Sequence, residues 1–215
     1  MREILVFYLV MCAATRVGAT QAPQEEGTRW AIEATGNAGI RLPGSNGLRS
    51  YSFSPGDPKG QVTQGVAAVL GARVTAWSGR RLGVDLSVDY APSQGTDVFG
   101  ESGNVTTASM RLLVGLVPRT APKSLYVAAG IARVAHGGTA YSFTRLNGSA
   151  WGPVVGVGGR ATLGRRIALF AEANEYTYTL SGARSPTSPF APNPREYDVA
   201  VSLGLSIAPW WRRAA

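Results

Sequence analysis

The sequence contains one histidine and one cysteine, so it has almost none of the side chains that bind transition metals or act as thiol nucleophiles. Charged residues make up 16% of the chain, against about 25% in a typical soluble domain. Only two of the 21 basic residues are lysines, Lys59 and Lys123. The composition is therefore poor in imidazole and thiol groups and in the lysines that usually cover a water-exposed surface.

Long apolar runs are also missing after the N-terminus, which predicts no transmembrane helix. Residues 4–14 form an apolar run of eleven residues behind a short charged start, and Val17-Gly18-Ala19 offers small residues for cleavage. This layout predicts a signal peptide over residues 1–19, followed by a short segment over 20–28. Cys12 lies in the apolar run, so a chain cleaved after Ala19 would have no cysteine left to form a disulfide.

The dominant pattern is alternation with a period of two. In residues 82–90 (LGVDLSVDY) and 197–208 (YDVAVSLGLSIA), apolar side chains alternate with small or polar ones. Weaker copies occur at 62–77, 104–118, 125–131 and 153–161, and further strands are expected from Arg29 and within 167–180. The pattern predicts eight strands, each with one apolar and one polar face. In the seventh strand Glu172 and Glu175 could share a face only across a bulge.

The predicted connections alternate in length. Those at 78–81, 119–123 and 163–166 are short, whereas those at about 39–61, 92–103, 136–149 and 181–195 are long and rich in Gly, Ser, Pro and Asn. Short turns at one end and long loops at the other are typical of transmembrane barrels. A soluble barrel would instead place the apolar face inside, but the polar faces here carry few charges.

Aromatic residues gather at the predicted strand ends. We expect a girdle with Trp30, Trp77, Trp210 and Trp211 near the periplasmic rim, and with Tyr90, Trp151 and Tyr197 near the outer rim.

These patterns resemble the family of small bacterial outer-membrane β-barrels of the OmpA/OmpX type, over almost the whole mature chain. The resemblance implies an all-β fold, an eight-stranded antiparallel up-and-down transmembrane β-barrel over residues 29–209, with a tail at 210–215. It also implies a location in the bacterial outer membrane and periplasmic termini. The chain departs from the family at its end, where Trp210 and Trp211 are followed by Arg-Arg-Ala-Ala instead of closing the sequence.

An eight-stranded barrel is about filled by its own side chains. The residues expected to face inward include a set of charges that should pair with one another, namely Glu33, Arg73, Asp85, Asp89, Arg111, Arg160 and Glu172. Two interpretations follow, a gated ion path or a rigid polar plug, and we favour the plug.

Catalysis is not predicted. His136 stands alone at the edge of a predicted loop, and a nucleophilic mechanism would need a hydroxyl and an orienting group beside it. Thr139 and Ser142 follow in a Gly-rich loop, without the His-x-Ser-Asn of a deacylase. No spacing of His, Cys and carboxylates indicates a metal, and we expect no cofactor and no nucleic acid.

The sequence therefore predicts a non-enzymatic integral outer-membrane protein with a structural or surface-interaction role carried by its loops. The alternatives are an outer-membrane enzyme acting on lipid A and a soluble lipocalin-like barrel that binds a ligand. Expected partners are outer-membrane lipid and lipopolysaccharide, the barrel-assembly machinery and an extracellular ligand at the loops, and we expect a monomer.

Overall fold

The computed structural model describes residues 30–44, 48–49, 61–97, 99–143, 148–164, 166–179 and 195–211. Eight long strands account for most of them: β1 (Trp30–Pro43), β4 (Ala67–Ser78), β5 (Leu82–Asp97), β6 (Ser102–Gly115), β7 (Lys123–Gly138), β8 (Gly148–Thr162), β9 (Ile167–Thr179) and β10 (Arg195–Trp211). Two short strands, β2 (Leu48–Arg49) and β3 (Gln61–Gln64), and one helical turn, α2 (Thr139–Phe143), are added. Among these residues no helix has the length and apolar character to cross a bilayer. The predicted signal peptide and the segment over 20–28 lie outside the described residues.

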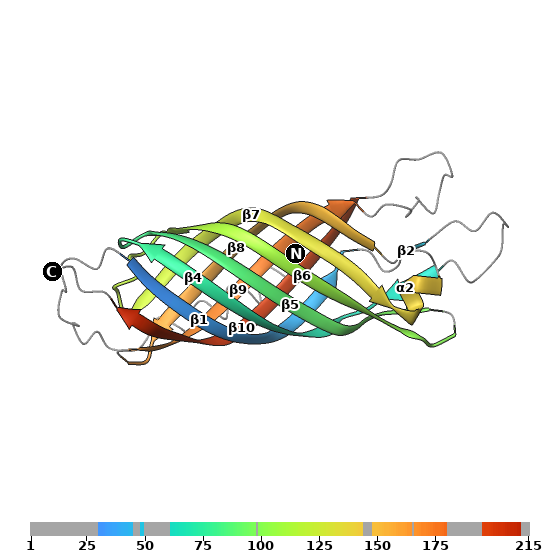
Figure 1. The fold of residues 1–215 in the computed structure, drawn as a ribbon, viewed down its shortest axis with the longest axis horizontal. Coiled ribbons are helices and arrows are strands. Elements are labelled where there is room, and N and C mark those ends of the chain that lie inside the picture. The colour runs from blue at the N-terminus through green and yellow to red at the C-terminus, as the bar shows by residue number, and fades with distance from the viewer. Residues whose placement is uncertain are drawn as a thin grey trace, which may run out of the picture.

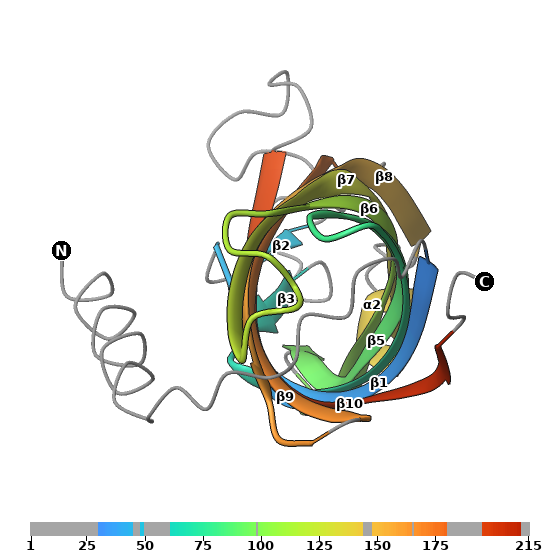
Figure 2. The same cartoon turned by 90° about the vertical axis from the view of Figure 1, so that its left-hand side faces the viewer.

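The long strands form a closed antiparallel barrel, as predicted. Each one pairs with the next long strand along the chain, and β1 closes the ring against β10 (Figures 1 and 2). Following paired residues once round the barrel from Glu33 ends at Pro43, ten residues further along β1. A shear of ten over eight strands tilts the strands by about 40° when they rise ~3.3 Å per residue and lie ~4.8 Å apart.

The outward face of the barrel is apolar. Every long strand places large hydrophobic side chains outside, among them Ile40, Leu70, Met110 and Leu203. The inward residues alternate with these and are buried. This confirms the choice of an inside-polar membrane barrel over a lipocalin-like one, because a soluble barrel would bury its apolar face.

We call the end away from Trp30 and Trp211 the outer end. There the strands run further than predicted, since β5 continues to Asp97, β6 begins at Ser102 and α2 follows directly on β7. Backbone N–H groups of Phe99 and Glu101 donate to the Asp97 carboxylate and shape the short turn between β5 and β6. Several residues predicted as loop are therefore paired strand that projects past the apolar belt.

The structure settles two predicted details of the last strands. β10 includes Trp210 and Trp211, which were predicted to belong to the tail. Glu172 faces inward and Glu175 outward on a regular β9, so no bulge is needed there.

The ladder between β8 and β9 stops short of the outer end. Their paired residues begin at Val154 and Tyr176, although both strands continue towards the outer end. The next residue of β8 is Pro153, which has no N–H to donate to a ladder.

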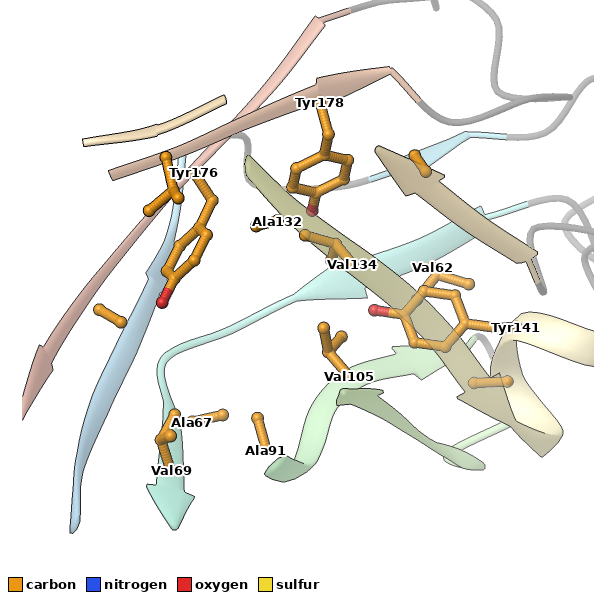
Figure 3. Packing of buried hydrophobic residues seen from close by; sticks show 14 residues of the cluster. Val62, Ala67, Val69, Ala91, Val105, Ala132, Val134, Tyr141, Tyr176 and Tyr178 are labelled. Carbon is orange, nitrogen blue, oxygen red and sulfur yellow. The ribbon is translucent and has the colours of Figure 1, made fainter. Parts of the chain in front are cut away.

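The interior is packed in successive levels. Near the terminal end lies an apolar cluster with Trp77, Leu113 and Tyr126, and towards the outer end a larger cluster with small side chains and Tyr141, Tyr176 and Tyr178 (Figure 3). The charged residues described next lie mainly at the level between them.

Candidate functional site

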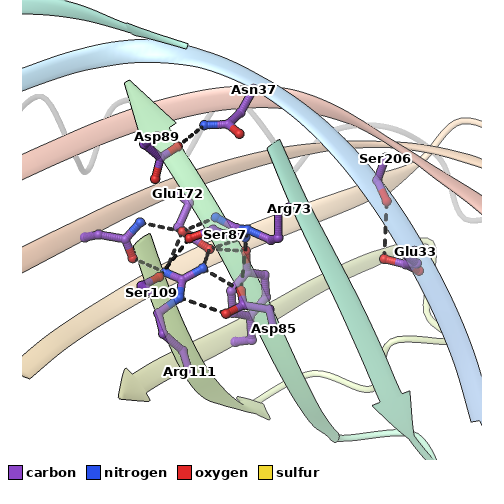
Figure 4. A network of polar contacts seen from close by, with 12 residues as sticks. Glu33, Asn37, Arg73, Asp85, Ser87, Asp89, Ser109, Arg111, Glu172 and Ser206 are labelled. Carbon is purple, nitrogen blue, oxygen red and sulfur yellow. Dashed lines mark hydrogen bonds and ion pairs between the residues drawn. The ribbon is translucent and has the colours of Figure 1, made fainter. Parts of the chain in front are cut away.

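The centre of the barrel holds four charged side chains, one each from β4, β5, β6 and β9. They are Arg73, Asp85, Arg111 and Glu172, all predicted to face inward, and each is at most 7% exposed (Figure 4). Strict alternation puts them inside, because each belongs to the same face as its small or polar neighbours two residues away. We call these four residues the central charge cluster.

Arg111 joins the two carboxylates of the central charge cluster. Its Nε and Nη2 donate to the two oxygens of Asp85 at 3.0 and 2.5 Å, and its Nη1 donates to Glu172 Oε1 at 2.8 Å. Arg73 donates to both Glu172 oxygens at 2.7 and 2.5 Å, and its Nε lies 3.4 Å from Asp85 Oδ2. Two positive and two negative charges thus balance within one contact network.

Neutral groups complete this network. The Tyr126 hydroxyl donates to Glu172 Oε2 at 2.6 Å, Asn174 contacts both Arg111 and Glu172, and the Arg73 guanidinium lies 4.9 Å from the centre of the Phe170 ring. Hydrogen bonds of this kind offset part of the cost of removing charges from water.

A second ion cluster lies nearer the terminal end. Glu33 accepts from Arg119 Nε at 3.0 Å and forms ion pairs with Arg119 Nη2 at 2.8 Å and Arg160 Nη2 at 3.1 Å. A cavity of about 20 Å³ separates it from the central charge cluster, bordered by Arg73, Trp77 and Tyr126 among others. That volume has room for roughly one water molecule. Arg119 was missed from the sequence because it sits in a turn, where no alternation indicates which way a side chain points.

Asp89 stands apart from both ion clusters. Its carboxylate accepts from Asn37 Nδ2 at 2.9 Å, and no hydrogen bond or ion pair joins it to an arginine among the described residues. The structure therefore divides the seven predicted lumen charges into a cluster of four, a pair formed by Glu33 and Arg160, and Asp89 alone.

A third charged contact lies towards the outer end. Arg41 donates to Asp198 Oδ2 through Nε at 3.0 Å and Nη2 at 2.6 Å, and to the Thr107 hydroxyl at 2.5 Å. Arg41 was assigned to a loop that began at residue 39, and this is why it was left out of the inward charges.

His136 is also placed differently from the prediction. It is 4% exposed inside the barrel, not solvated at a loop edge, because β7 continues past it to Gly138. Its Nε2 lies 3.4 Å from the Tyr178 hydroxyl, and its ring meets the Tyr141 ring edge to face at 4.9 Å. Burial raises the pKa of Tyr141, on α2, to about 12. Thr139 and Ser142, by contrast, are exposed.

The predicted aromatic girdle is found in part. Tyr90, Trp151 and Tyr197 face outward near the outer end, whereas Trp77 was wrongly assigned to it. Trp77 is 4% exposed inside the barrel and packs edge to face on Tyr126. Trp77 lies on the same inward face of β4 as Arg73. A position at a strand end does not by itself make a side chain point outward.

Three predicted girdle residues remain, Trp30, Trp210 and Trp211. Their side chains are not among those that the structure describes. Their backbones pair at the terminal end of the barrel, where Ala31 meets Trp211 and Trp30 meets Ser78.

Chemically, the described interior is dominated by paired charges. Within the described part of the chain, no three or more His, Cys, Asp or Glu residues are grouped to hold a metal ion. The central charge cluster contains arginines, carboxylates and hydrogen-bonding partners that contact one another, and the Arg73 Nε lies near Asp85 without forming a hydrogen bond. Such an arrangement fixes the side chains from β4, β5, β6 and β9 against one another.

Comparison with known proteins agrees with this architecture. The model of the outer membrane protein beta-barrel domain family matches residues 9–205. The crystal structure of OprG from Pseudomonas aeruginosa superposes with a TM-score of 0.56 at 12% identity, covering 87% of this chain and 99% of that one. The outer membrane protein AlkL, solved in lipid bilayers, gives a TM-score of 0.50 at 18% identity, covering 93% and 98%. No curated protein matches the sequence.

Proposed function

Because the chain belongs to the outer membrane protein beta-barrel domain family, we propose that it is a non-enzymatic barrel, closed to solutes, with a structural and surface-interaction role. It lies in the bacterial outer membrane, and the signal peptide over 1–19 would direct its export. The barrel-assembly machinery would insert it, lipopolysaccharide and lipid would surround it, and the outer connections would carry any specificity for an extracellular ligand.

The central charge cluster is the observation that carries this proposal. Its members reach inward from β4, β5, β6 and β9. The ion pairs of Glu172 on β9 with Arg73 on β4 and with Arg111 on β6 cross the lumen, whereas Arg111 and Asp85 pair along the wall between neighbouring strands. A solute would have to separate at least one buried pair, and an unpaired charge inside a protein costs several kcal/mol. The ion cluster around Glu33 and the aromatic cluster with Tyr141 and Tyr176 supply further obstructions below and above it.

The same geometry supports a non-enzymatic role. His136 is enclosed by Tyr141 and Tyr178, so a lipid A molecule in the outer leaflet has no direct approach to the imidazole. The two nearby hydroxyl residues, Thr139 and Ser142, face solvent instead.

Conductance in planar lipid bilayers tests the closed barrel. The refolded wild-type protein should add no steady ohmic conductance, and neither should a control such as Leu112→Ala on the outward face of β6. Arg111→Glu, which places three carboxylates against one guanidinium, should lower stability to urea without opening a channel. A steady wild-type conductance, or a variant that conducts while keeping wild-type stability, would show that the cluster is a gate.

A further inference from the structure

Two charges face outward from the barrel wall near the outer rim of its apolar belt, where the first of them pairs with Trp151 of the outer girdle. Among the described outward residues at that level, only Arg133 on β7 and Glu175 on β9 are charged, and both are exposed. Glu175 has no hydrogen bond or ion pair with a described residue, whereas Arg133 donates to the Ser149 hydroxyl at 3.1 and 2.9 Å. A charged side chain on the lipid face destabilises a barrel to a degree that grows with its depth. A partner outside the chain would remove this penalty.

The two charges flank one strand at nearly the same depth. Arg133 pairs with Trp151 of β8, and Glu175 pairs with Val155, four residues further along that strand. Because the shear is ten over eight strands, residues paired on neighbouring strands differ in depth by about 1.25 residues. Over the two steps from β7 to β9 this offsets about 2.5 of the four residues. Arg133 and Glu175 therefore differ in depth by about 1.5 residues, or ~4 Å along the membrane normal. The exposed residue of β8 between them is Pro153.

This placement is self-complementary. A two-fold axis along the membrane normal beside Pro153 would bring Arg133 of one copy opposite Glu175 of a second copy, and the reverse contact would form by symmetry. Both charges would then be neutralised by the same interface. We propose that this face, formed by Arg133, Trp151, Pro153, Val155 and Glu175, is the surface on which a second copy of the chain docks in the membrane. We call it the β8 face.

The surroundings of Pro153 fit close approach by another barrel. The β8–β9 ladder stops at Val154, so lipid at this level meets backbone that is not held in a regular ladder, and such groups are costly in hydrocarbon. The outward residues of β9 below Glu175 are Ala171 and Ala173, and small side chains allow two membrane walls to come near each other. Trp151, 66% exposed, would contribute a large apolar contact at the rim.

An anionic lipid would neutralise only one of the two charges on the β8 face. A phosphate of lipopolysaccharide would attract Arg133, but it would be repelled by Glu175 at almost the same depth. A second copy satisfies both charges, in place of the monomer expected from the sequence.

Charge-reversal substitutions at Arg133 and Glu175 test the proposal in phosphatidylcholine vesicles that contain no lipopolysaccharide. Wild-type protein should show energy transfer between donor- and acceptor-labelled copies at low protein-to-lipid ratio. Arg133→Glu and Glu175→Arg should each weaken the association at least tenfold, because each places like charges in both contacts, and the double exchange should restore it. Association that is absent in wild type, unchanged in the single variants, or not restored in the double variant would overturn the proposal.

Disulfide crosslinking supplies an independent readout. The described residues contain no cysteine, and the chain's one cysteine falls in the predicted signal peptide. Pro153→Cys should crosslink to its own copy at least tenfold faster than Leu70→Cys, which is equally outward-facing but lies on β4, across the barrel. Heat-modifiable gel migration would verify that every variant is folded. Equal crosslinking at both positions, or dimers that form only when lipopolysaccharide is added, would contradict a direct contact between copies.

Discussion

Arg111 bridges Asp85 and Glu172, so its loss should unbalance the centre of the barrel. Arg111→Met keeps a long side chain but removes one of two positive charges from the central charge cluster. Glu172 would retain Arg73, while Asp85 would retain only the 3.4 Å contact with the Arg73 Nε. The central charge cluster would then hold two carboxylates and one guanidinium, which leaves one negative charge in excess.

The expected cost follows from this imbalance. Breaking a buried pair by removing one partner typically destabilises a protein by about 3–5 kcal/mol. A pair at about 4 Å in surroundings of effective dielectric constant ~20 is worth about 4 kcal/mol, which agrees with that range. The double variant Arg111→Met with Asp85→Asn restores neutrality, so it should be more stable than the sum of the single losses implies, by about 1–3 kcal/mol.

Reversible urea unfolding in phospholipid vesicles, followed by tryptophan fluorescence and heat-modifiable migration, measures these differences. Arg80→Met, the same substitution in an exposed turn, is the control and should stay within about 0.5 kcal/mol of wild type. A loss below about 1 kcal/mol for Arg111→Met, or strictly additive losses in the double variant, would refute the view that the cluster is a tightly coupled plug.

Three further variants probe other parts of the wall and core by the same unfolding assay. Tyr126→Phe removes the 2.6 Å hydrogen bond to Glu172 and should cost about 1.5–3 kcal/mol, whereas no measurable loss would mean that this bond is replaced. Gly83→Val should cost about 1–3 kcal/mol, because a Cβ at this position lies 2.8 Å from the Trp77 ring; unchanged stability would show that the ring can move. Leu86→Arg, on the lipid face, should cost about 2–4 kcal/mol in vesicles, and tolerance would place that residue outside the bilayer.

Alternation made much of this fold predictable. Where outward residues are apolar, as around Asp85 and Arg111, the period of two identifies the inward charges without ambiguity. The pattern also indicated that Glu172 and Glu175 could not share a face on a regular strand. It did not reveal which cation each carboxylate meets, because shear sets which residues lie level across the lumen.

The signal weakens where the strands leave the lipid. His136 lies on paired strand beyond the apolar belt, where outward residues need not be hydrophobic, and it was assigned to a loop edge. Arg41 lies between the apolar residues Ile40 and Leu42, but it was assigned to a Gly- and Pro-rich loop that began at residue 39, whereas β1 continues to Pro43. Arg119 lies in a turn, which has no period at all. Trp77 was misplaced for a different reason, since aromatic residues at strand ends also fill the inside of a narrow barrel.

The Arg41–Asp198 ion pair joins the first and last strands of the barrel, 157 residues apart in the chain. Every other pairing of long strands is between neighbours in sequence. Pairing β1 with β10 therefore has the largest cost in chain entropy of all the pairings of long strands. A one-residue slip between β1 and β10 would turn one member of the pair towards lipid. The ion pair therefore stabilises only the correct register of β1 against β10, at the seam that closes the barrel.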